Sequence, residues 1–268
     1  MSWLIKFALS IAGLYALVVL LVAVMQGAIV FPRSLVGPSP TLPDDTQILS
    51  VTRPDGSVLQ GSLIPGQNPT KPLILAFGGN AWNADAVALF VHGIAPEYPV
   101  AAFHFRGYAP STGRPSADAL KADAVALYDY LAPNATNGII AIGFSVGSGV
   151  AAHLSAERPI DGAVLVTPFD SLVAIGKQTM PWLPVRLLFR HEMNALEALK
   201  TSRTPIALIL ASQDEVIPPA RAKSLVDGLR ASDRAVAAIS QIQAGHNDIY
   251  AHPQFADDLR NALSAVAD

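Results

Sequence analysis

The sequence predicts a mostly parallel α/β sheet with helices on both faces, preceded by one long apolar helix. Three observations predict it. Short apolar runs bounded by turn residues recur through the chain, which is typical of buried parallel strands. A Pro-Asp-Gly turn at 54–56 joins the first two strand-like runs into a hairpin. An uncharged apolar run, 7–31, precedes all of them.

The apolar run FALSIAGLYALVVLLVAVMQGAIVF extends from Phe7 to Phe31. As a helix it would cover roughly 37 Å, enough to cross a hydrocarbon layer about 30 Å thick with some tilt. A cleaved signal peptide has a shorter apolar core, and residues 25–28 form a poor cleavage site. We therefore expect residues 1–33 to be a single-pass transmembrane signal anchor. A cleaved signal peptide and a buried soluble helix are the alternatives.

The flanking charges indicate which side of the membrane carries the rest of the chain. Lys6 and the amino terminus flank the run on one side, and Arg33 followed by Asp44 and Asp45 flanks the other. Because positively charged flanks favour the cytoplasm, we expect the globular domain on the non-cytoplasmic side. Residues 34–45 are rich in proline and predict a semi-rigid linker.

The globular domain is expected over residues 46–268, beginning with the hairpin and continuing as a series of strands and helices. A helical stretch at 116–131 carries its leucines on one face. The segment 168–204 is too long for a simple crossover and predicts a short cap-like insertion. The expected strands are 47–53, 57–64, 73–77, 100–105, 139–142, 163–166, 206–211 and 236–242.

Composition excludes several classes of protein. The net charge is −3, and the 18 Lys and Arg residues are scattered, so we expect no nucleic-acid partner. The chain contains no cysteine, which excludes disulfides, thiolate metal sites and cysteine nucleophiles. We expect neither a metal nor an organic cofactor.

The motif Gly143-Phe-Ser145-Val-Gly147 follows an expected strand and begins a stretch of small residues, VGSGVAAHLS, that predicts a helix. In a parallel sheet, chemistry gathers at the carboxyl ends of the strands. Glycines two residues before and after the serine permit a sharp strand-to-helix turn that side chains would obstruct. The context favours Ser145 as a nucleophile over a serine in an ordinary tight turn.

A serine nucleophile needs a base, and the base needs an acid that orients it. Asp214 follows the strand at 206–211, and His246 follows the last strand, at 236–242. We expect these two residues to be the acid and the base. Asp170, which also follows a strand, is the alternative acid.

Other acidic and histidine side chains near these positions have different expected roles. We expect Glu215 to point away from the site and Asp248 to support the histidine loop. His104 follows a strand end and stays a candidate neighbour of the site. The remaining histidines are expected in packing, surface or insertion positions: His92, His153, His191 and His252.

Acyl transfer also requires donors for an oxyanion. The amide of Val146 is expected at a helix start, where N–H groups point outward. The loop FGGNAWN follows the strand at 73–77, and its glycines permit close approach of the backbone to a substrate. We assign the second oxyanion amide to Asn80.

From Thr46 onward the chain resembles the α/β-hydrolase superfamily. Within it, the chain is similar to the membrane-tethered Bem46-like group, which includes ABHD13-like and ABHD17-like serine hydrolases. The resemblance implies an α/β-hydrolase fold with Ser145, Asp214 and His246 as triad and the Asn80 and Val146 amides as oxyanion hole. It rests on these segments: the Asp-Gly hairpin, FGGNAWN, FRGYAPSTGRPS, GFSVG, PWLPVRLLF, SQDEVIPP and GHND.

One departure from the family pattern concerns the oxyanion loop. The family usually has His-Gly before the oxyanion residue, whereas this chain has Gly78-Gly79. The missing imidazole is expected to loosen the support of the loop without removing the donor amides.

The expected activity is hydrolysis of an ester or thioester of a small-molecule or lipid-like acyl substrate, through an acyl-enzyme. A serine peptidase of the aminopeptidase kind and a catalytically silent scaffold are the alternatives. The insertion is short, so we expect an open mouth. Its apolar residues, Trp182 and 187–189, would bind an acyl chain, touch the membrane or merely cover the sheet.

Overall fold

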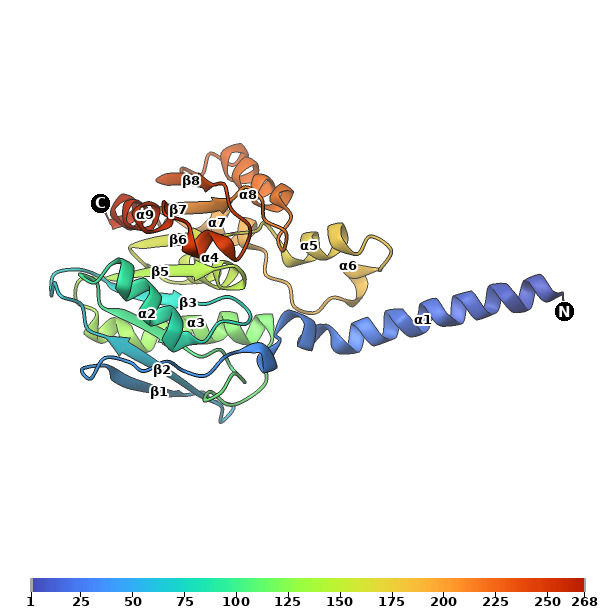
Figure 1. Cartoon of the computed structure of the whole chain (residues 1–268), viewed down its shortest axis with the longest axis horizontal. Helices are drawn as coiled ribbons and strands as arrows, with labels where there is room; N and C mark the ends of the chain where they lie inside the picture. Colours follow the sequence, from blue (N-terminus) through green and yellow to red (C-terminus); the bar gives the residue numbers. More distant parts are fainter. Residues whose placement is uncertain (1, 268) are drawn as a thin grey trace.

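The computed structural model describes residues 2–267; Met1 and Asp268, the outer ends of the expected anchor and hydrolase domain, lie outside the described residues. The described residues form one eight-stranded sheet in the order β1-β2-β4-β3-β5-β6-β7-β8, with a long helix projecting from it (Figure 1). β2 pairs antiparallel with β1 and β4, and every other pair is parallel. This sheet confirms the expected α/β-hydrolase architecture with its amino-terminal antiparallel hairpin.

The element boundaries agree closely with the expected ones. The strands are β1 (Gln47–Thr52), β2 (Val58–Ile64), β3 (Leu73–Phe77), β4 (Val100–Phe103), β5 (Ile139–Phe144), β6 (Gly162–Val166), β7 (Ile206–Ala211) and β8 (Ala238–Ile242). The α-helices are α1 (Trp3–Val30), α2 (Ala84–Ile94), α3 (Ala117–Leu131), α4 (Val146–Glu157), α5 (Leu172–Thr179), α6 (Val185–Leu188), α7 (Ala195–Thr201), α8 (Pro219–Ala231) and α9 (Phe255–Ala267). The 3₁₀ turns are η1 (Arg33–Leu35), η2 (Ala132–Asn134) and η3 (Asp248–Ala251).

Three strands differ from expectation by two residues at one end, and β1, β2 and β6 differ by one. β5 continues to Phe144 because it lies between β3 and β6, and Phe144 pairs with Val166. β4 ends at Phe103, since the chain turns immediately afterwards and Tyr108 donates its amide to the Phe105 carbonyl. β8 is an edge strand and begins at Ala238, where pairing with β7 begins.

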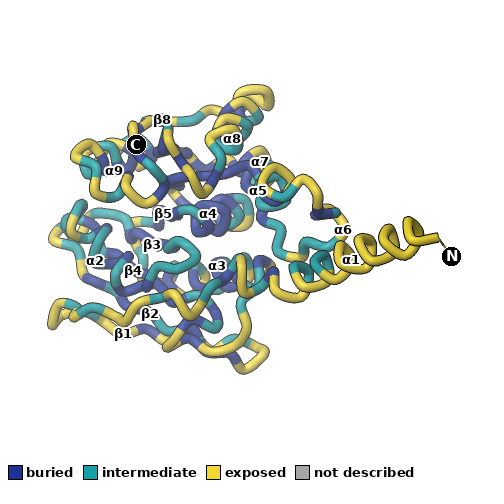
Figure 2. Tube along the Cα trace, turned by 45° about the vertical axis from the view of Figure 1, so that its right-hand side comes forward, coloured by how far each residue is buried: buried dark blue, intermediate teal, exposed yellow. Residues whose placement is uncertain are grey.

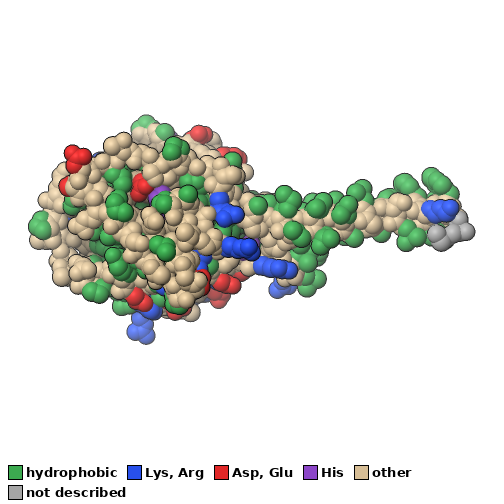
Figure 3. All heavy atoms as spheres, turned by 90° about the horizontal axis from the view of Figure 1, so that it is seen from below, with side chains coloured by type: hydrophobic (Ala, Val, Ile, Leu, Met, Phe, Trp, Pro, Cys, Tyr) green, Lys and Arg blue, Asp and Glu red, His purple; other side chains and the backbone are tan. Residues whose placement is uncertain are grey.

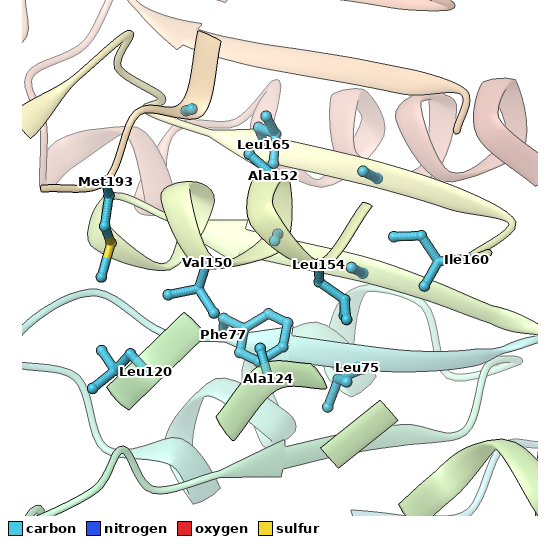
Figure 4. Packing of buried hydrophobic residues seen from close by; sticks show 14 of the residues in the cluster. Leu75, Phe77, Leu120, Ala124, Val150, Ala152, Leu154, Ile160, Leu165 and Met193 are labelled. Atoms are coloured by element: carbon cyan, nitrogen blue, oxygen red, sulfur yellow. The ribbon is translucent and has the colours of Figure 1, made fainter. Parts of the chain in front are cut away.

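The helices form a layer on each face of the sheet. α3, α4, α7 and α8 bury one hydrophobic cluster, and α2 and α9 bury the other. Figure 4 shows Leu75 and Phe77 of β3 beside Leu120 of α3 and Val150 and Leu154 of α4. β3, β5 and β6 are buried along their whole length, so both faces of each strand are covered. Their sequences are therefore continuous apolar runs instead of alternating apolar and polar residues.

Helix α1 projects from the domain with most of its surface exposed (Figure 2). Among the described residues it is the one helix long and apolar enough to cross a membrane, by length and composition. The apolar run continues past the helix, but its last residue, Phe31, is only 1% exposed and belongs to the domain core. The uncharged run therefore ends inside the protein.

The proline-rich linker lies against the domain. It begins with the turn η1, and Val36 packs on the core. The Asn83 side chain donates to the Gly37 carbonyl at 3.1 Å and to Ser39 Oγ at 3.2 Å. The same Asn83 caps the amino terminus of α2, so the linker is tied to the loop that follows β3.

The segment 168–204 divides into two parts. α7 packs on α4 and continues the helical layer that covers the sheet. α5 and α6 project from the domain on the side of α1, and α6 lies beside the part of α1 nearest the domain (Figure 1). We call residues 180–190, which include α6, the cap segment.

Candidate active site

Ser145 lies on the turn between β5 and α4 with a φ of 50° and a ψ of −119°. A positive φ is strained for a non-glycine residue, and a strained turn of this kind exposes the serine hydroxyl at the strand end. A Cβ added at Gly143 would lie 2.2 Å from the Gly147 carbonyl oxygen, and one added at Gly147 would lie 2.2 Å from the Phe77 carbonyl oxygen. Both glycines of the motif are therefore required by close backbone packing.

Three side chains from three strand ends meet at this turn. Ser145 Oγ lies 2.9 Å from His246 Nε2, and His246 Nδ1 lies 2.7 Å from Asp214 Oδ2. Asp214 and His246 are 8% and 5% exposed, so their contact is shielded from water. The structure thus brings together the three side chains that the sequence singled out, with His246 between Ser145 and Asp214.

The second oxygen of Asp214 is also occupied. Asp214 Oδ1 accepts the amides of Val216 at 3.0 Å and Ile217 at 2.6 Å. These two bonds hold the carboxylate in one orientation, with Oδ2 left for His246. The loop sequence after β7 therefore positions the acid.

Glu215 has a role that the sequence did not indicate. Its Oε2 accepts the backbone amide of His246 at 2.9 Å, and this bond is the main reason why the Glu215 pKa is lowered. Among the described residues, the carboxylate that hydrogen-bonds the histidine loop is thus Glu215 and not Asp248, the residue expected there. The feature of the sequence that could have suggested this role for Glu215 is its position directly after Asp214, at the end of a strand.

The rival acid and the rival histidine are engaged elsewhere. Asp170 accepts a hydrogen bond from Arg221 at 3.1 Å and one from its neighbour, the Ser171 amide. His104 lies 3.2 Å from Asp85, which also accepts from the Ser62 hydroxyl. Burial opposes ionisation of Asp85, but hydrogen bonds from His104 and two serines outweigh it and lower the Asp85 pKa to about 2. Asp85 on α2 therefore connects this helix to β2 through Ser62 and to the end of β4 through His104.

The loop after β3 passes close to Ser145. A Cβ added at Gly79 would lie 3.7 Å from the Ser145 Cβ. Within residues 2–267, no backbone carbonyl accepts the Asn80 amide, and Val146 is the first residue of α4, whose amide has no partner within the helix. Within residues 2–267, both amides expected as oxyanion donors therefore lack a backbone acceptor, and both residues lie next to Ser145 in the chain or in the loop that approaches it.

Contacts from other segments support this loop in place of the missing histidine. The Tyr108 hydroxyl donates to the Asn80 carbonyl at 2.8 Å, and Asn80 Nδ2 lies 3.4 Å from the carbonyl of Val30, the last residue of α1. A Cβ at Gly78 would lie 2.9 Å from Val87 Cγ2, so the loop backbone packs closely on α2 there. The loop is held by Tyr108, α2 and the end of α1.

A cleft of ≈ 370 Å³ opens over Ser145. Its lining residues, all in the described part of the chain, include no Asp or Glu and none from 168–204. Trp82 and Tyr250 form an apolar wall, with ring centroids 5.0 Å apart. Burial raises the pKa of Tyr250 to about 12, so its hydroxyl stays neutral. The other lining residues are Gly79, Asn80, Ala81, Val216, His246 and Asn247.

The sheet order and the strand-to-helix turn that carries Ser145 define an α/β-hydrolase architecture. The esterase Pf2001 of Pyrococcus furiosus has the same fold, with a TM-score of 0.65 and 19% identity, over 85% of this chain and 99% of that one. The chain therefore has the α/β-hydrolase fold.

Proteins of several organisms are similar to this chain in sequence. An uncharacterized protein of Mycobacterium tuberculosis is 31% identical over 231 residues, which cover 82% of this chain and 79% of that protein. An uncharacterized membrane protein of Saccharomyces cerevisiae is 26% identical, with 94% of this chain and 95% of that protein covered. The alpha/beta hydrolase domain-containing protein WAV2 of Arabidopsis thaliana is 26% identical, with 58% and 56% covered. No family model matches the chain.

Proposed function

We propose that this protein is a membrane-anchored serine hydrolase that cleaves ester or thioester bonds through an acyl-enzyme. The observation that carries the proposal is the line of contacts from Ser145 Oγ to His246 Nε2, 2.9 Å, and from His246 Nδ1 to Asp214 Oδ2, 2.7 Å. In this arrangement a base is within reach of the hydroxyl proton, and an acid is within reach of the base.

In the first half of the reaction, His246 Nε2 takes the Ser145 proton while Oγ attacks the acyl carbonyl carbon. The carbonyl oxygen becomes an oxyanion, which the Asn80 and Val146 amides stabilise; each such donor contributes about 3 kcal/mol in comparable sites. The imidazolium is stabilised by Asp214. It then protonates the leaving alcohol or thiol as the tetrahedral intermediate collapses to the acyl-enzyme.

In the second half, water takes the place of the leaving group. His246 removes a proton from the water, and the resulting hydroxide attacks the acyl carbon. The same two amides hold the second oxyanion. When the intermediate collapses, His246 returns its proton to Ser145 and the carboxylic acid leaves.

The proposed substrate is a lipid-like or otherwise acylated small molecule. The cleft over Ser145 has an aromatic wall of Trp82 and Tyr250, which suits an apolar acyl group. Its position next to the end of α1, through the Asn80–Val30 contact, would keep it close to a membrane surface. Membership of the Bem46-like group is part of this proposal.

Fluorophosphonate labelling tests the nucleophile. We expect the wild-type protein to be labelled and the Ser145→Ala variant to remain unlabelled, because the probe phosphonylates only an activated serine hydroxyl. Circular dichroism of the variant checks that it is folded. Labelling that persists in Ser145→Ala would show that another residue is the nucleophile.

The same experiment separates the alternatives. A folded wild-type protein that takes no label would favour the catalytically silent scaffold. An aminopeptidase needs a carboxylate to hold the substrate amine, and no Asp or Glu lines the described cleft, so this alternative gains no support. Ester, thioester and aminoacyl reporter substrates distinguish the enzymatic activities directly.

The proposed anchor is α1, which is supported by its apolar length and by the yeast relative described as a membrane protein. The proposed orientation places the hydrolase domain outside the cytoplasm, because Lys6 lies on the amino-terminal side of the apolar run and Asp44 and Asp45 lie on the domain side. The positive charges of Arg33, Arg186 and Arg190 on the domain side favour the opposite orientation. We expect protease added to intact cells to digest the domain. Protection of the domain until the cells are permeabilised would reverse the orientation.

A further inference from the structure

Specific hydrogen bonds join the cap segment to the stretch of α1 between Tyr15 and Gln26. The Tyr15 hydroxyl donates to the Trp182 carbonyl at 2.8 Å. About three turns further along the helix, Gln26 donates to the Leu188 carbonyl at 3.0 Å and accepts the Arg190 amide at 2.7 Å. The cap segment therefore lies along α1 from Tyr15 to Gln26. Within the described residues, the free part of the helix is the part that precedes Tyr15.

The free part of α1 is too short to cross a bilayer by itself. α1 contains 28 residues, Trp3–Val30, and its free part ends at Leu14. Twelve residues of helix rise about 18 Å, whereas the hydrocarbon layer is about 30 Å thick. If α1 spans the membrane, as in the proposed function, part of the Tyr15–Gln26 stretch lies within the hydrocarbon. The cap segment, which contacts that stretch, then enters the membrane with it.

The polar side chains of the apolar run fit this position. Among residues 7–31 they are Ser10, Tyr15 and Gln26. Ser10 donates to the Lys6 carbonyl within the helix, and the other two bond the cap segment. A polar group in hydrocarbon needs such a partner because no water is present to replace it.

The outer surface of the cap segment also suits a lipid leaflet. Trp182 is 51% exposed and Leu187 is 85% exposed. Arg186 and Arg190 are exposed beside them, and Figure 3 shows Lys and Arg side chains gathered next to hydrophobic ones where the helix meets the domain. Tryptophan prefers the membrane interface, and arginine next to it can reach anionic headgroups.

The inner surface of the cap segment does not face the substrate cleft. Leu183, Leu188 and Phe189 line a small cavity of ≈ 30 Å³ against Val19 and Val22 of α1. None of the residues that line the cleft over Ser145, within the described chain, comes from the cap segment. Contacts with α1 are therefore the contacts that Leu183 and Leu188 make in this cavity, and nothing in the cleft lining supports acyl-chain binding by the cap segment within the described chain.

We propose that the cap segment is seated in the near leaflet of a lipid bilayer beside α1, with Trp182 and Leu187 among the lipid chains and headgroups. The inference rests on the proposed membrane anchor. It also adds to the proposed function where the cleft lies relative to the membrane, because Asn80 of the oxyanion loop contacts the end of α1. With the cap segment in the leaflet, the cleft opens just outside the headgroup layer, where an amphiphilic acyl substrate would leave the membrane.

The test uses the absence of cysteine in the chain. Single variants Leu187→Cys, Leu9→Cys and Ser264→Cys are labelled with the fluorophore NBD in the full-length protein. Each is reconstituted into phosphatidylcholine–phosphatidylglycerol vesicles with and without lipids that carry a nitroxide on the acyl chain. Leu9 lies on the free part of α1, and Ser264 is an exposed control on α9.

We expect blue-shifted NBD emission and loss of most of the fluorescence to nitroxide quenching at positions 9 and 187, with neither effect at position 264. Quenching at position 9 but not at 187 would overturn the inference and leave the anchor intact. No quenching at position 9 would show that the anchor itself is wrong. Energy transfer between differently labelled 187 variants, without nitroxide quenching, would show that a second copy of the chain covers this surface and would also overturn the inference.

Discussion

Replacing Asp214 with asparagine is expected to lower kcat by about four orders of magnitude while the fold is retained, as happens when the triad aspartate of a serine protease is replaced in this way. Asp214 Oδ1 accepts the Val216 and Ile217 amides, and the Asn oxygen would keep both bonds. The new NH₂ group would then face His246 Nδ1 and donate to it. That places the imidazole proton on Nε2, which can no longer accept the proton of Ser145.

The matched control is Asp170→Asn, because Asp170 also follows a strand end but pairs with Arg221. We expect the Asp170 variant to keep kcat close to the wild-type value. The measurement is turnover of a soluble ester reporter per folded protein, with circular dichroism on both variants. A loss of turnover in the Asp170 variant, with turnover retained in the Asp214 variant, would exchange the two assignments.

Replacing Arg106 with glutamine is expected to lower the free energy of unfolding by about 3 kcal/mol, because it leaves a buried carboxylate with less compensation. Arg106 is 7% exposed and bonds Asp123, itself 5% exposed, through two nitrogens; it also pairs with Asp55. The hydrogen bonds that Arg106 donates to Asp123 raise the Arg106 pKa well above its ordinary value. In the variant, Asp123 keeps only its bond from Arg53.

The control for this prediction is Arg158→Gln. Arg158 also forms a two-nitrogen pair, with Asp129, but these side chains are 32% and 51% exposed. An exposed pair contributes less than about 1 kcal/mol. For a domain of this size, we expect the apparent Tm to fall by about 6–12 °C for Arg106→Gln and by less than about 4 °C for Arg158→Gln. Equal shifts would mean that burial does not decide the contribution of the Arg106 pair.

Local sequence patterns were sufficient to predict the sheet and to single out the three side chains that meet at Ser145. Buried strands are continuous apolar runs because both of their faces are covered, so β3, β5, β6 and β7 could be placed before any pairing was known. The glycines around Ser145 reflect clashes within a few residues of backbone, together with the crossing of Phe77. Asp214 and His246 could be assigned because carboxyl ends of parallel strands share one edge.

Patterns of this kind do not report contacts between distant segments. Glu215 supports the His246 amide across 31 positions of sequence, and Tyr108 holds the Asn80 carbonyl across 28. Local spacing shows Glu215 only as an acidic neighbour of Asp214, and it does not distinguish Tyr108 from exposed or packing residues. For the same reason, the missing histidine at Gly78 indicated a loosely held loop, although distant contacts support it.

Local periodicity and strand ends were enough to predict the fold class, the eight strands within a few residues, and the group formed by Ser145, Asp214 and His246. The relation between the apolar run and the insertion became apparent only from contacts in the folded chain. Hydropathy could not show that Phe31 belongs to the core, nor that Gln26 bonds the cap segment. The hydropathy of a side chain depends on its residue type and not on its neighbours. The packing of α1 on the cap segment decides which residues of α1 remain exposed to lipid.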